Sequence, residues 1–385
     1  MMRALIAGLG ASALGIMLLL PLAAQEPPEN AIEALQARMD AGEITLGFDE
    51  NGHGRLRDVL KALDIPEESQ VLPFSKSSLQ FTHINPQHPR AVYFNDDISI
   101  GAVVDGDLLE IMVNNRKGGV AFYTLPTGRN ETPRFRRESA LCVACHALVG
   151  NRVVGWIVSD ITTTNDGMPQ FPVPTRPFTF TDHTTAFEDR WGGWYVTGTT
   201  GKMRHRGNVM SDPARPYDLP ETEGLNLTDL SGHFDLKQTL QPSSDVVALM
   251  VLEHQTGFTN RAYALNILPD EDDLDRMALY MTFAEEVALP DPVKGNTRFA
   301  EGFAARGPRD AKGRSLRDFD LKKRLFRHPL SYMIYSTAFD ALRPDTKAKL
   351  WQKLHEILRR TPEGREAIAI AAATKPDIPD SWKTP

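Results

Sequence analysis

The chain has 385 residues, of which 41% are hydrophobic and 24% are charged, a composition that is typical of globular proteins and excludes wholesale disorder. Its 43 basic and 50 acidic residues give a net charge of −7, which excludes a chain-wide basic surface for nucleic acid. Only two cysteines are present, so a disulfide framework is excluded as well. The length corresponds to two or three domains, which can bury large cores without covalent cross-links.

Residues 1–24 predict an export signal. Arg3 is the only charged residue before Glu26, and small or apolar residues fill most of the segment between them. A basic residue followed by an apolar run and small residues is typical of a secretory signal. The run is also just long enough to cross a bilayer as a retained anchor. We therefore expect a periplasmic or otherwise extracytoplasmic protein, which contacts a membrane only if this segment is kept.

The N-terminal part predicts two helices and then a sheet. Apolar residues recur at helical spacing over residues 28–40 and 54–63, with Gly and Pro after them. From residue 71 onward the pattern changes to short apolar runs separated by Asn, Asp and Gly, which is hairpin chemistry. These runs predict an antiparallel meander of about four strands, at residues 91–94, 98–104, 108–113 and 120–125.

The rest of the chain predicts one short central helix, a few strands and then a run of helices. The central helix is expected over residues 138–148, and further strands over 155–161 and 194–199 with a Pro- and Thr-rich loop, residues 167–181, between them. Helical spacing of apolar residues follows at 243–265, 270–288, 316–326, 329–342, 346–359 and 364–373. Strands before helices predict an α+β fold. The expected divisions are a signal (1–24), a β-rich N-terminal region (25–137), a cofactor-binding region (138–242) and a helical C-terminal region (243–385).

The two cysteines lie in one short motif, Cys-Val-Ala-Cys-His, in which Cys142 and Cys145 precede His146. Cys-x-x-Cys-His is the attachment signature of c-type haem. On one helical turn the three side chains share a face, so the thiols can reach the two vinyl groups of one porphyrin while the imidazole binds the iron. One motif predicts one covalently attached haem c. Because bacteria attach this haem outside the cytoplasm, the motif and the export signal agree.

Two other readings of the motif are weaker. A thioredoxin-type dithiol would also use Cys-x-x-Cys, but it normally follows a strand, and residues 134–137 are a poor buried strand. A structural zinc site needs four ligands, and the sequence has no second cysteine pair or suitably spaced histidine pair. Haem c remains the leading interpretation.

The chain resembles a group of exported bacterial proteins that are similar to c-type cytochromes and have no assigned activity. The resemblance extends over most of the chain from about Phe81 and implies a secreted haem protein. Arg206 departs from the similar sequences, which often carry Met there, so we assign it no ligand role. The segments that carry the resemblance are residues 81–86, 91–97, 142–146, 181–183, 190–196, 204–208, 252–256 and 328–335.

The sixth iron ligand is left open among several residues. His205 is the first candidate, because it lies in a Gly-bounded loop that could project one side chain. His254, His183 and either Met203 or Met210 are its rivals, as is an open or water-bound site. Methionine or histidine at this position favours electron transfer, whereas an open position permits chemistry at the iron.

Electron transfer by an exported monohaem c-type cytochrome is the predicted function, with a redox partner protein that the sequence does not name. The alternatives are a haem enzyme of peroxidase or oxidase type, which would act on a small-molecule substrate, and a haem-based sensor. No nucleic acid is expected as a partner. Four arginines that precede the motif are candidates for contact with the haem propionates, because guanidinium groups suit carboxylates; they are Arg129, Arg134, Arg136 and Arg137.

Overall fold

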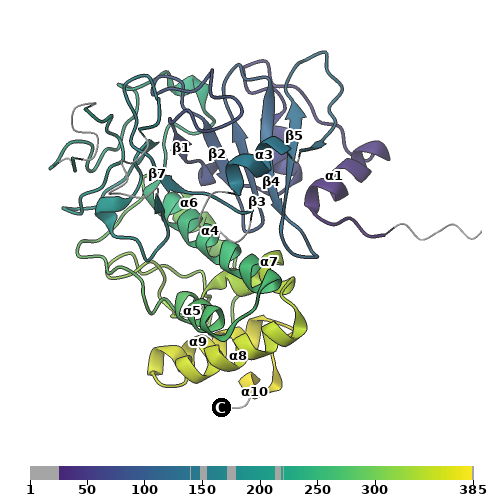
Figure 1. Cartoon of the computed structure of the whole chain (residues 1–385), viewed down its shortest axis with the longest axis vertical. Helices are drawn as coiled ribbons and strands as arrows, with labels where there is room; N and C mark the ends of the chain where they lie inside the picture. The colour runs from purple at the N-terminus through teal and green to yellow at the C-terminus, as the bar shows by residue number, and fades with distance from the viewer. Residues whose placement is uncertain are drawn as a thin grey trace, which may run out of the picture.

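The computed structural model describes residues 26–138, 140–147, 154–170, 179–212, 218–219 and 221–383. The predicted export signal lies outside these ranges, as does part of the predicted central loop. In the described part of the chain, antiparallel strands build the N-terminal half and helices build the C-terminal half (Figure 1). The predicted α+β class is confirmed.

The main sheet is a five-stranded antiparallel meander, in which each strand pairs with the next along the chain. Its tight turns use residues that suit them: Asn95 accepts hydrogen bonds from the amides that follow it, and Asp105 and Gly118 adopt positive φ. The four predicted strands are present, and an exposed edge strand that was not predicted completes the sheet. The strands are β2 (Ala91–Phe94), β3 (Ile98–Ala102), β4 (Leu108–Asn114), β5 (Val120–Pro126) and β6 (Arg136–Glu138).

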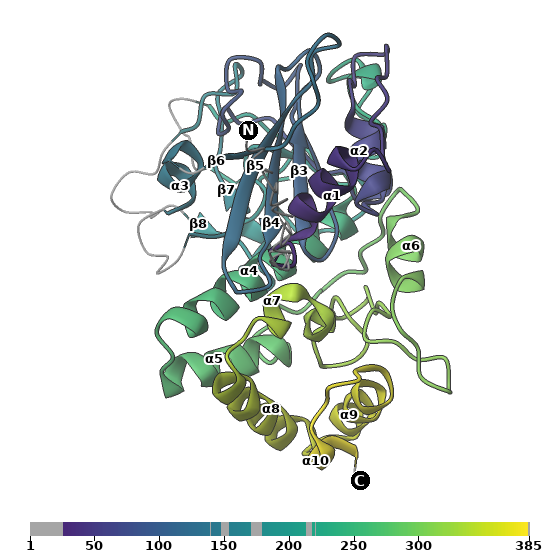
Figure 2. The same ribbon diagram turned by 90° about the vertical axis from the view of Figure 1, so that its right-hand side faces the viewer.

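Side chains that alternate along the strands give this sheet two apolar faces. Tyr93, Ile100 and Ile111, which are opposite one another in the ladder, share a core with the first two helices. Val92 and Met112 point to the other face and join the core of the longest helix. Figure 2 shows α1 and α2 on one side of the sheet and α3 on the other. These helices are α1 (Ala31–Asp40), α2 (Leu56–Ala62), α3 (Ala140–His146) and, longest, α4 (Val246–Ile267).

Helix α4 connects the two halves of the molecule (Figure 1). Asp245 caps its N-terminus, because the Asp245 side chain accepts the amide hydrogens of Val247 and Ala248. Most of its side chains are buried, because the sheet covers one part of its surface and the C-terminal helices cover another. Those helices are α5 (Glu271–Met281), α6 (Phe299–Ala305), α7 (Thr337–Asp340), α8 (Pro344–Leu358), α9 (Pro362–Thr374) and α10 (Asp380–Lys383).

Two of the predicted helices are wrong. Residues 316–326 form turns instead, in which the Asp320 side chain accepts three successive amides and Leu321 has a positive φ. Residues 329–342 are divided into a 3₁₀ turn (Tyr332–Tyr335) and α7. Ser331 and Ser336 each cap one of these two pieces, so their hydroxyl groups start new turns where a continuous helix was expected.

Two short strand pairs complete the fold. In the first pair, β1 (Leu72–Pro73) is hydrogen-bonded to β9 (Trp194–Tyr195). In the second pair, β7 (Ser159–Asp160) is hydrogen-bonded to β8 (Thr179–Phe180). The strands predicted over residues 155–161 and 194–199 are thus present but only two residues long. Three further 3₁₀ turns lie at Glu67–Ser69, Phe187–Asp189 and Leu236–Gln238. Within the described residues, no helix has the length and apolar character that crossing a membrane requires.

Candidate functional site

The cysteine motif forms the short helix α3, which lies on the face of the sheet opposite to α1 and α2 (Figure 2). Cys142, Cys145 and His146 are separated by three and four residues, so they occupy one side of the helix. Both thiols are free. Cys142 is partly buried and packs against the core, whereas Cys145 is exposed. The Cys142 thiol is therefore packed against the protein, and the Cys145 thiol is open to solvent.

The imidazole of His146 is held in one orientation by a backbone carbonyl. Its Nδ1 lies 2.7 Å from the oxygen of Gly155, and the amide of Gly155 donates in return to the His146 carbonyl at 3.3 Å. A carbonyl can only accept, so Nδ1 carries the proton. Burial lowers the pKa of His146, which keeps the ring neutral. The unprotonated nitrogen with the lone pair is then Nε2, the state in which a histidine binds a metal.

The surroundings of α3 are partly aromatic and partly charged. The rings of His146 and Phe122 have centroids 4.8 Å apart. Burial, assisted by nearby carboxylates, raises the pKa of Cys142 to about 11. Arg90 and Glu110 form an ion pair of 2.6 Å beside the motif, and their charges act on both Cys142 and His146. Sequence reasoning missed this pair, although a glutamate in the apolar run of β4 is a signal that could have found it.

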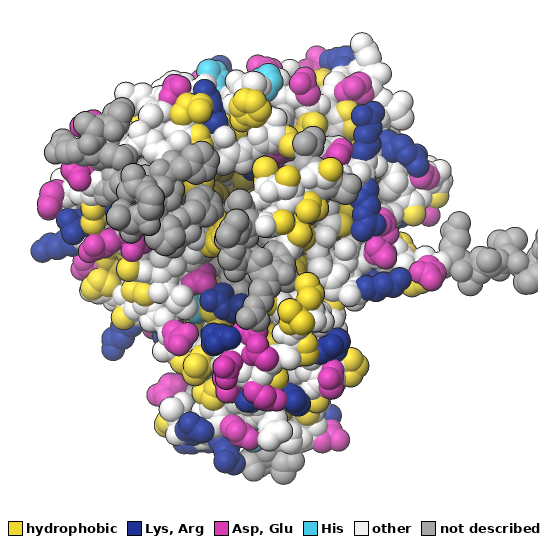
Figure 3. Space-filling view, in the orientation of Figure 1, with side chains coloured by type: hydrophobic (Ala, Val, Ile, Leu, Met, Phe, Trp, Pro, Cys, Tyr) yellow, Lys and Arg dark blue, Asp and Glu magenta, His cyan; other side chains and the backbone are white. Residues whose placement is uncertain are grey.

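Three of the four arginines proposed for the propionates lie close to carboxylates of the protein itself. Arg129 pairs with Glu50, Arg134 pairs with Asp40 at 3.1 Å, and Arg137 lies 3.4 Å from Glu29. Basic and acidic side chains lie side by side over the surface seen in Figure 3. Three of these arginines therefore already have a carboxylate within ion-pair distance, so a propionate would compete with it.

His205 is buried in a tautomer that does not suit iron ligation. Its Nδ1 accepts the amide hydrogen of Gly207 at 3.1 Å, and burial lowers its pKa to about 4. The neutral ring then has its proton on Nε2, which has no lone pair to give. The ring contacts Trp191 with centroids 5.1 Å apart. Met203 is buried in the core around α4, and Met210 is packed against the other core.

His183 and His254 lie together, although 71 residues separate them. Their Nδ1 atoms are 2.9 Å apart, so one ring donates its proton to the other. The Nε2 of His254 lies 2.7 Å from the hydroxyl of Ser331, and both nitrogens of His254 are thus engaged. The Nε2 of His183 is buried without a hydrogen-bond partner. This nitrogen has the lone pair that a metal needs in the tautomer in which Nδ1 of His183 is the donor to His254.

A buried ion pair fixes the segment that leads into β9. The Arg190 guanidinium lies 3.1 Å from the Glu253 carboxylate, and both side chains are almost fully buried, at 2% and 0% exposure. The second oxygen of Glu253 accepts the indole hydrogen of Trp191 at 3.0 Å. Trp194 donates to the carbonyl of Ser159. Both indoles pack in the protein core, and α4 holds Trp191 through Glu253.

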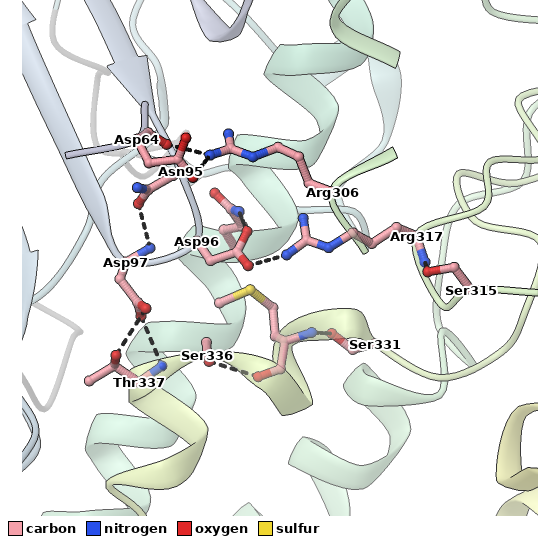
Figure 4. A network of polar contacts seen from close by, with 12 residues as sticks. Asp64, Asn95, Asp96, Asp97, Arg306, Ser315, Arg317, Ser331, Ser336 and Thr337 are labelled. Atoms are coloured by element: carbon pink, nitrogen blue, oxygen red, sulfur yellow. Dashed lines mark hydrogen bonds and ion pairs between the residues drawn. The ribbon is translucent and has the colours of Figure 1, made fainter. Parts of the chain in front are cut away.

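A second polar network fastens the β2–β3 turn to the C-terminal half (Figure 4). Asp96 pairs with Arg317, whose guanidinium contacts the rings of Phe303 and Tyr332. Arg306 pairs with Asp64 at 2.6 Å, and a cavity of about 390 Å³ opens beside both pairs. Asp97 accepts hydrogen bonds from the amide and hydroxyl of Thr337 at 3.0 and 2.9 Å. The network therefore joins the sheet to the start of α7.

Asp97 predicts a measurable pH dependence of stability. Burial, together with the charge of Asp96, raises its pKa from 3.8 to about 6. The folded state then binds more protons than the unfolded state between these pH values, so stability is lost as the pH rises through the window. Asp97→Asn keeps one of the two acceptor oxygens and cannot ionise, so it should remove the loss. Between pH 4 and pH 7.5, we expect the wild-type protein to lose about 2 kcal/mol of unfolding free energy that the variant keeps. This value follows from about 1.4 kcal/mol per pKa unit, reduced because the side chain is partly exposed.

Urea unfolding of both proteins at the two pH values measures this difference. Asp64→Asn is the control, because its carboxylate is exposed and we expect the same small change, within about 0.5 kcal/mol, at both pH values. An Asp97→Asn effect that is equal at pH 4 and pH 7.5 would contradict the raised pKa.

The residues of α3 fit a covalently held haem. The two thiols are unpaired with each other, they share a helix side with His146, and the hydrogen bond to Gly155 leaves the histidine lone pair on Nε2. Gly155 was missed as a functional residue in the sequence, although a lone glycine in a predicted strand often marks a close backbone approach. Comparison of the chain with protein-family models, with curated proteins and with solved structures finds no match.

Proposed function

We propose that the protein is an exported monohaem c-type cytochrome that transfers electrons. The observation that carries the proposal is the state of His146, a neutral imidazole whose Nδ1 hydrogen is bound by a carbonyl, on the same helix side as two free thiols. A hydrogen bond of this kind orients a metal-ligating histidine and increases its basicity. An ordinary buried histidine could also be neutral and bound to a carbonyl, but it would not share a helix side with two free cysteines.

Cys142 and Cys145 would hold the group covalently. Each thiol would add across the double bond of one vinyl group. The sulfur would form a bond to one vinyl carbon, the thiol hydrogen would transfer to the other carbon, and no group would leave. Two cysteines in the whole chain limit the protein to one haem attached in this way. The addition needs reduced thiols, and a disulfide between Cys142 and Cys145 would prevent it.

The bound haem would supply one-electron chemistry at its iron, which favours a carrier of electrons between two partner proteins. His146 would be the proximal ligand, Phe122 packs against its ring, and the Arg90–Glu110 charges lie beside the motif. For a carrier, we expect a strong ligand on the distal side too, and His183 suits this role in the tautomer that leaves the lone pair on its partnerless Nε2.

The purified exported protein tests the proposal. We expect one iron per chain, and a haem that stays with the denatured protein through acid-acetone extraction. Haem that extracts freely, or a protein without haem, would refute the covalent attachment. Low-spin ferric iron and slow or absent binding of carbon monoxide by the reduced protein are expected for a carrier. High-spin ferric iron that binds carbon monoxide rapidly would instead make the protein a haem enzyme or sensor.

A further inference from the structure

Helix α4 reaches the motif through the side chain of Asn260. The Oδ1 of Asn260 accepts the amide hydrogen of Trp156 at 2.8 Å, and its Nδ2 donates to the carbonyl of the same residue at 2.8 Å. One side chain thus satisfies both backbone groups of a residue 104 positions earlier in the chain. The indole of Trp156 donates in turn to Asn114 on β4. Trp156 is therefore fixed from the helix and from the sheet.

Gly155 precedes Trp156 and is in close contact with Asn260. A Cβ atom at Gly155 would lie 2.1 Å from the Oδ1 of Asn260 and 2.8 Å from its Cγ. The φ of Gly155 lies outside the left-handed region, so glycine is required here by space and not by backbone conformation. The carbonyl of this same glycine binds the His146 ring. Asn260 therefore determines where that carbonyl lies.

We propose that Asn260 is a positioning residue for the proximal iron ligand, and that it acts through the Gly155 carbonyl. This inference rests on the proposed function. The hydrogen bond from Nδ1 increases the basicity of the imidazole, and a more basic ligand stabilises ferric over ferrous iron. Asn260 thereby keeps the reduction potential low. Because α4 is buried and rigid, it is a suitable element from which to hold the carbonyl.

Asn260→Ala in the haem-loaded protein tests the proposal by potentiometric titration. We expect the midpoint potential to become more positive, by about a tenfold change in the equilibrium between ferric and ferrous iron, or 59 mV for one electron. Asn260→Ser is the second variant, in case the first does not fold. Its hydroxyl can replace at most one of the two bonds to Trp156 and adds no charge near the iron, so we expect a shift in the same direction that is no larger.

Asn266 offers a matched control on the same helix. Its Nδ2 donates to the Ala341 carbonyl and its Oδ1 accepts the Arg343 amide, so it also binds two backbone groups. We expect Asn266→Ala to lower thermal stability about as much as Asn260→Ala and to leave the potential unchanged. Equal potentials in the two variants would overturn the proposal, because Asn260 would then have only a structural role.

Gly155→Ala provides a double-mutant cycle. Alone, it forces Asn260 and the carbonyl apart and should raise the potential. In Gly155→Ala/Asn260→Ala the Asn260 side chain no longer collides with the new methyl group. The potential of the double variant should therefore be no more positive than that of Asn260→Ala. Additive shifts would overturn the proposed coupling. A wild-type protein without covalent haem would refute the proposed function itself, and loaded protein with unchanged potentials would refute this inference alone.

Discussion

We expect Cys142→Ala/Cys145→Ala to abolish covalent haem attachment, so that bound iron falls from one per chain to none after denaturing extraction. The reason is that two thioether bonds are the only covalent links that the chain can offer, since it has no other cysteine. His146→Ala should behave differently, because the thiols remain and the porphyrin can still be attached. In that variant we expect attached haem with altered iron ligation, visible as a change of spin state in the absorption spectrum.

His205→Ala is a suitable control for both experiments, because the buried ring accepts the Gly207 amide at Nδ1, which assigns the proton of the neutral ring to Nε2. We expect full attachment and an unchanged spectrum. If His205→Ala turns the ferric protein high-spin, His205 is the sixth ligand and must change tautomer when haem binds. Covalent haem in the double cysteine variant would contradict the proposed function.

The second large effect is expected at the buried ion pair. Glu253→Leu leaves the Arg190 guanidinium buried without its carboxylate, and loss of one partner of a buried pair costs about 3–5 kcal/mol. Burial raises the pKa of Glu253 to about 7 despite the opposing charge of Arg190, so the measurement belongs at pH 8, where the carboxyl group is ionised. Denaturant unfolding at this pH gives the difference from wild type.

Replacement of both partners, in Arg190→Met/Glu253→Leu, is the matched variant. With no charge left unpaired, we expect it to recover most of the loss, because apolar residues of similar volume often replace a buried pair without net cost. The indole of Trp191 loses its acceptor in both variants, so that contribution cancels in the comparison. The carbonyls of Thr185 and His183 lose the Arg190 donor in the double variant alone. If the double variant is as unstable as the single one, the cost arises from packing and from these lost hydrogen bonds, and not from the charge.

Local chemistry made the sheet predictable and the C-terminal turns unpredictable. The turns at Asn95 and Asp105 contain residues whose conformational preferences act within a few positions, so the sequence indicates them directly. Over residues 329–342 the apolar spacing suits a helix equally well. The hydroxyl groups of Ser331 and Ser336 decide against it by binding local amides, and serine in a helical pattern is too common to be a reliable signal.

The candidate site divides in the same way. The short helix that carries the three motif residues was predictable, because their spacing suits one helical turn. The partners of the motif were not, since Asn260 and Gly155 meet only after more than a hundred residues of intervening chain have folded. The pairing of His183 with His254 is likewise a tertiary contact. A histidine in a sequence does not reveal which of its nitrogens will be occupied.

The separation between Asn260 and the motif also sets an order of events during biosynthesis. Domains generally fold from the N-terminus as the chain emerges, and the meander uses only contacts between neighbouring strands. The sheet can thus form while α4, with Asn260, is still to come. Until then Trp156 lacks the two hydrogen bonds from Asn260, and Cys142, which packs against the core around α4, lacks part of its cover. Maturation enzymes that attach a cofactor would have this interval in which to work, and formation of these contacts would end it.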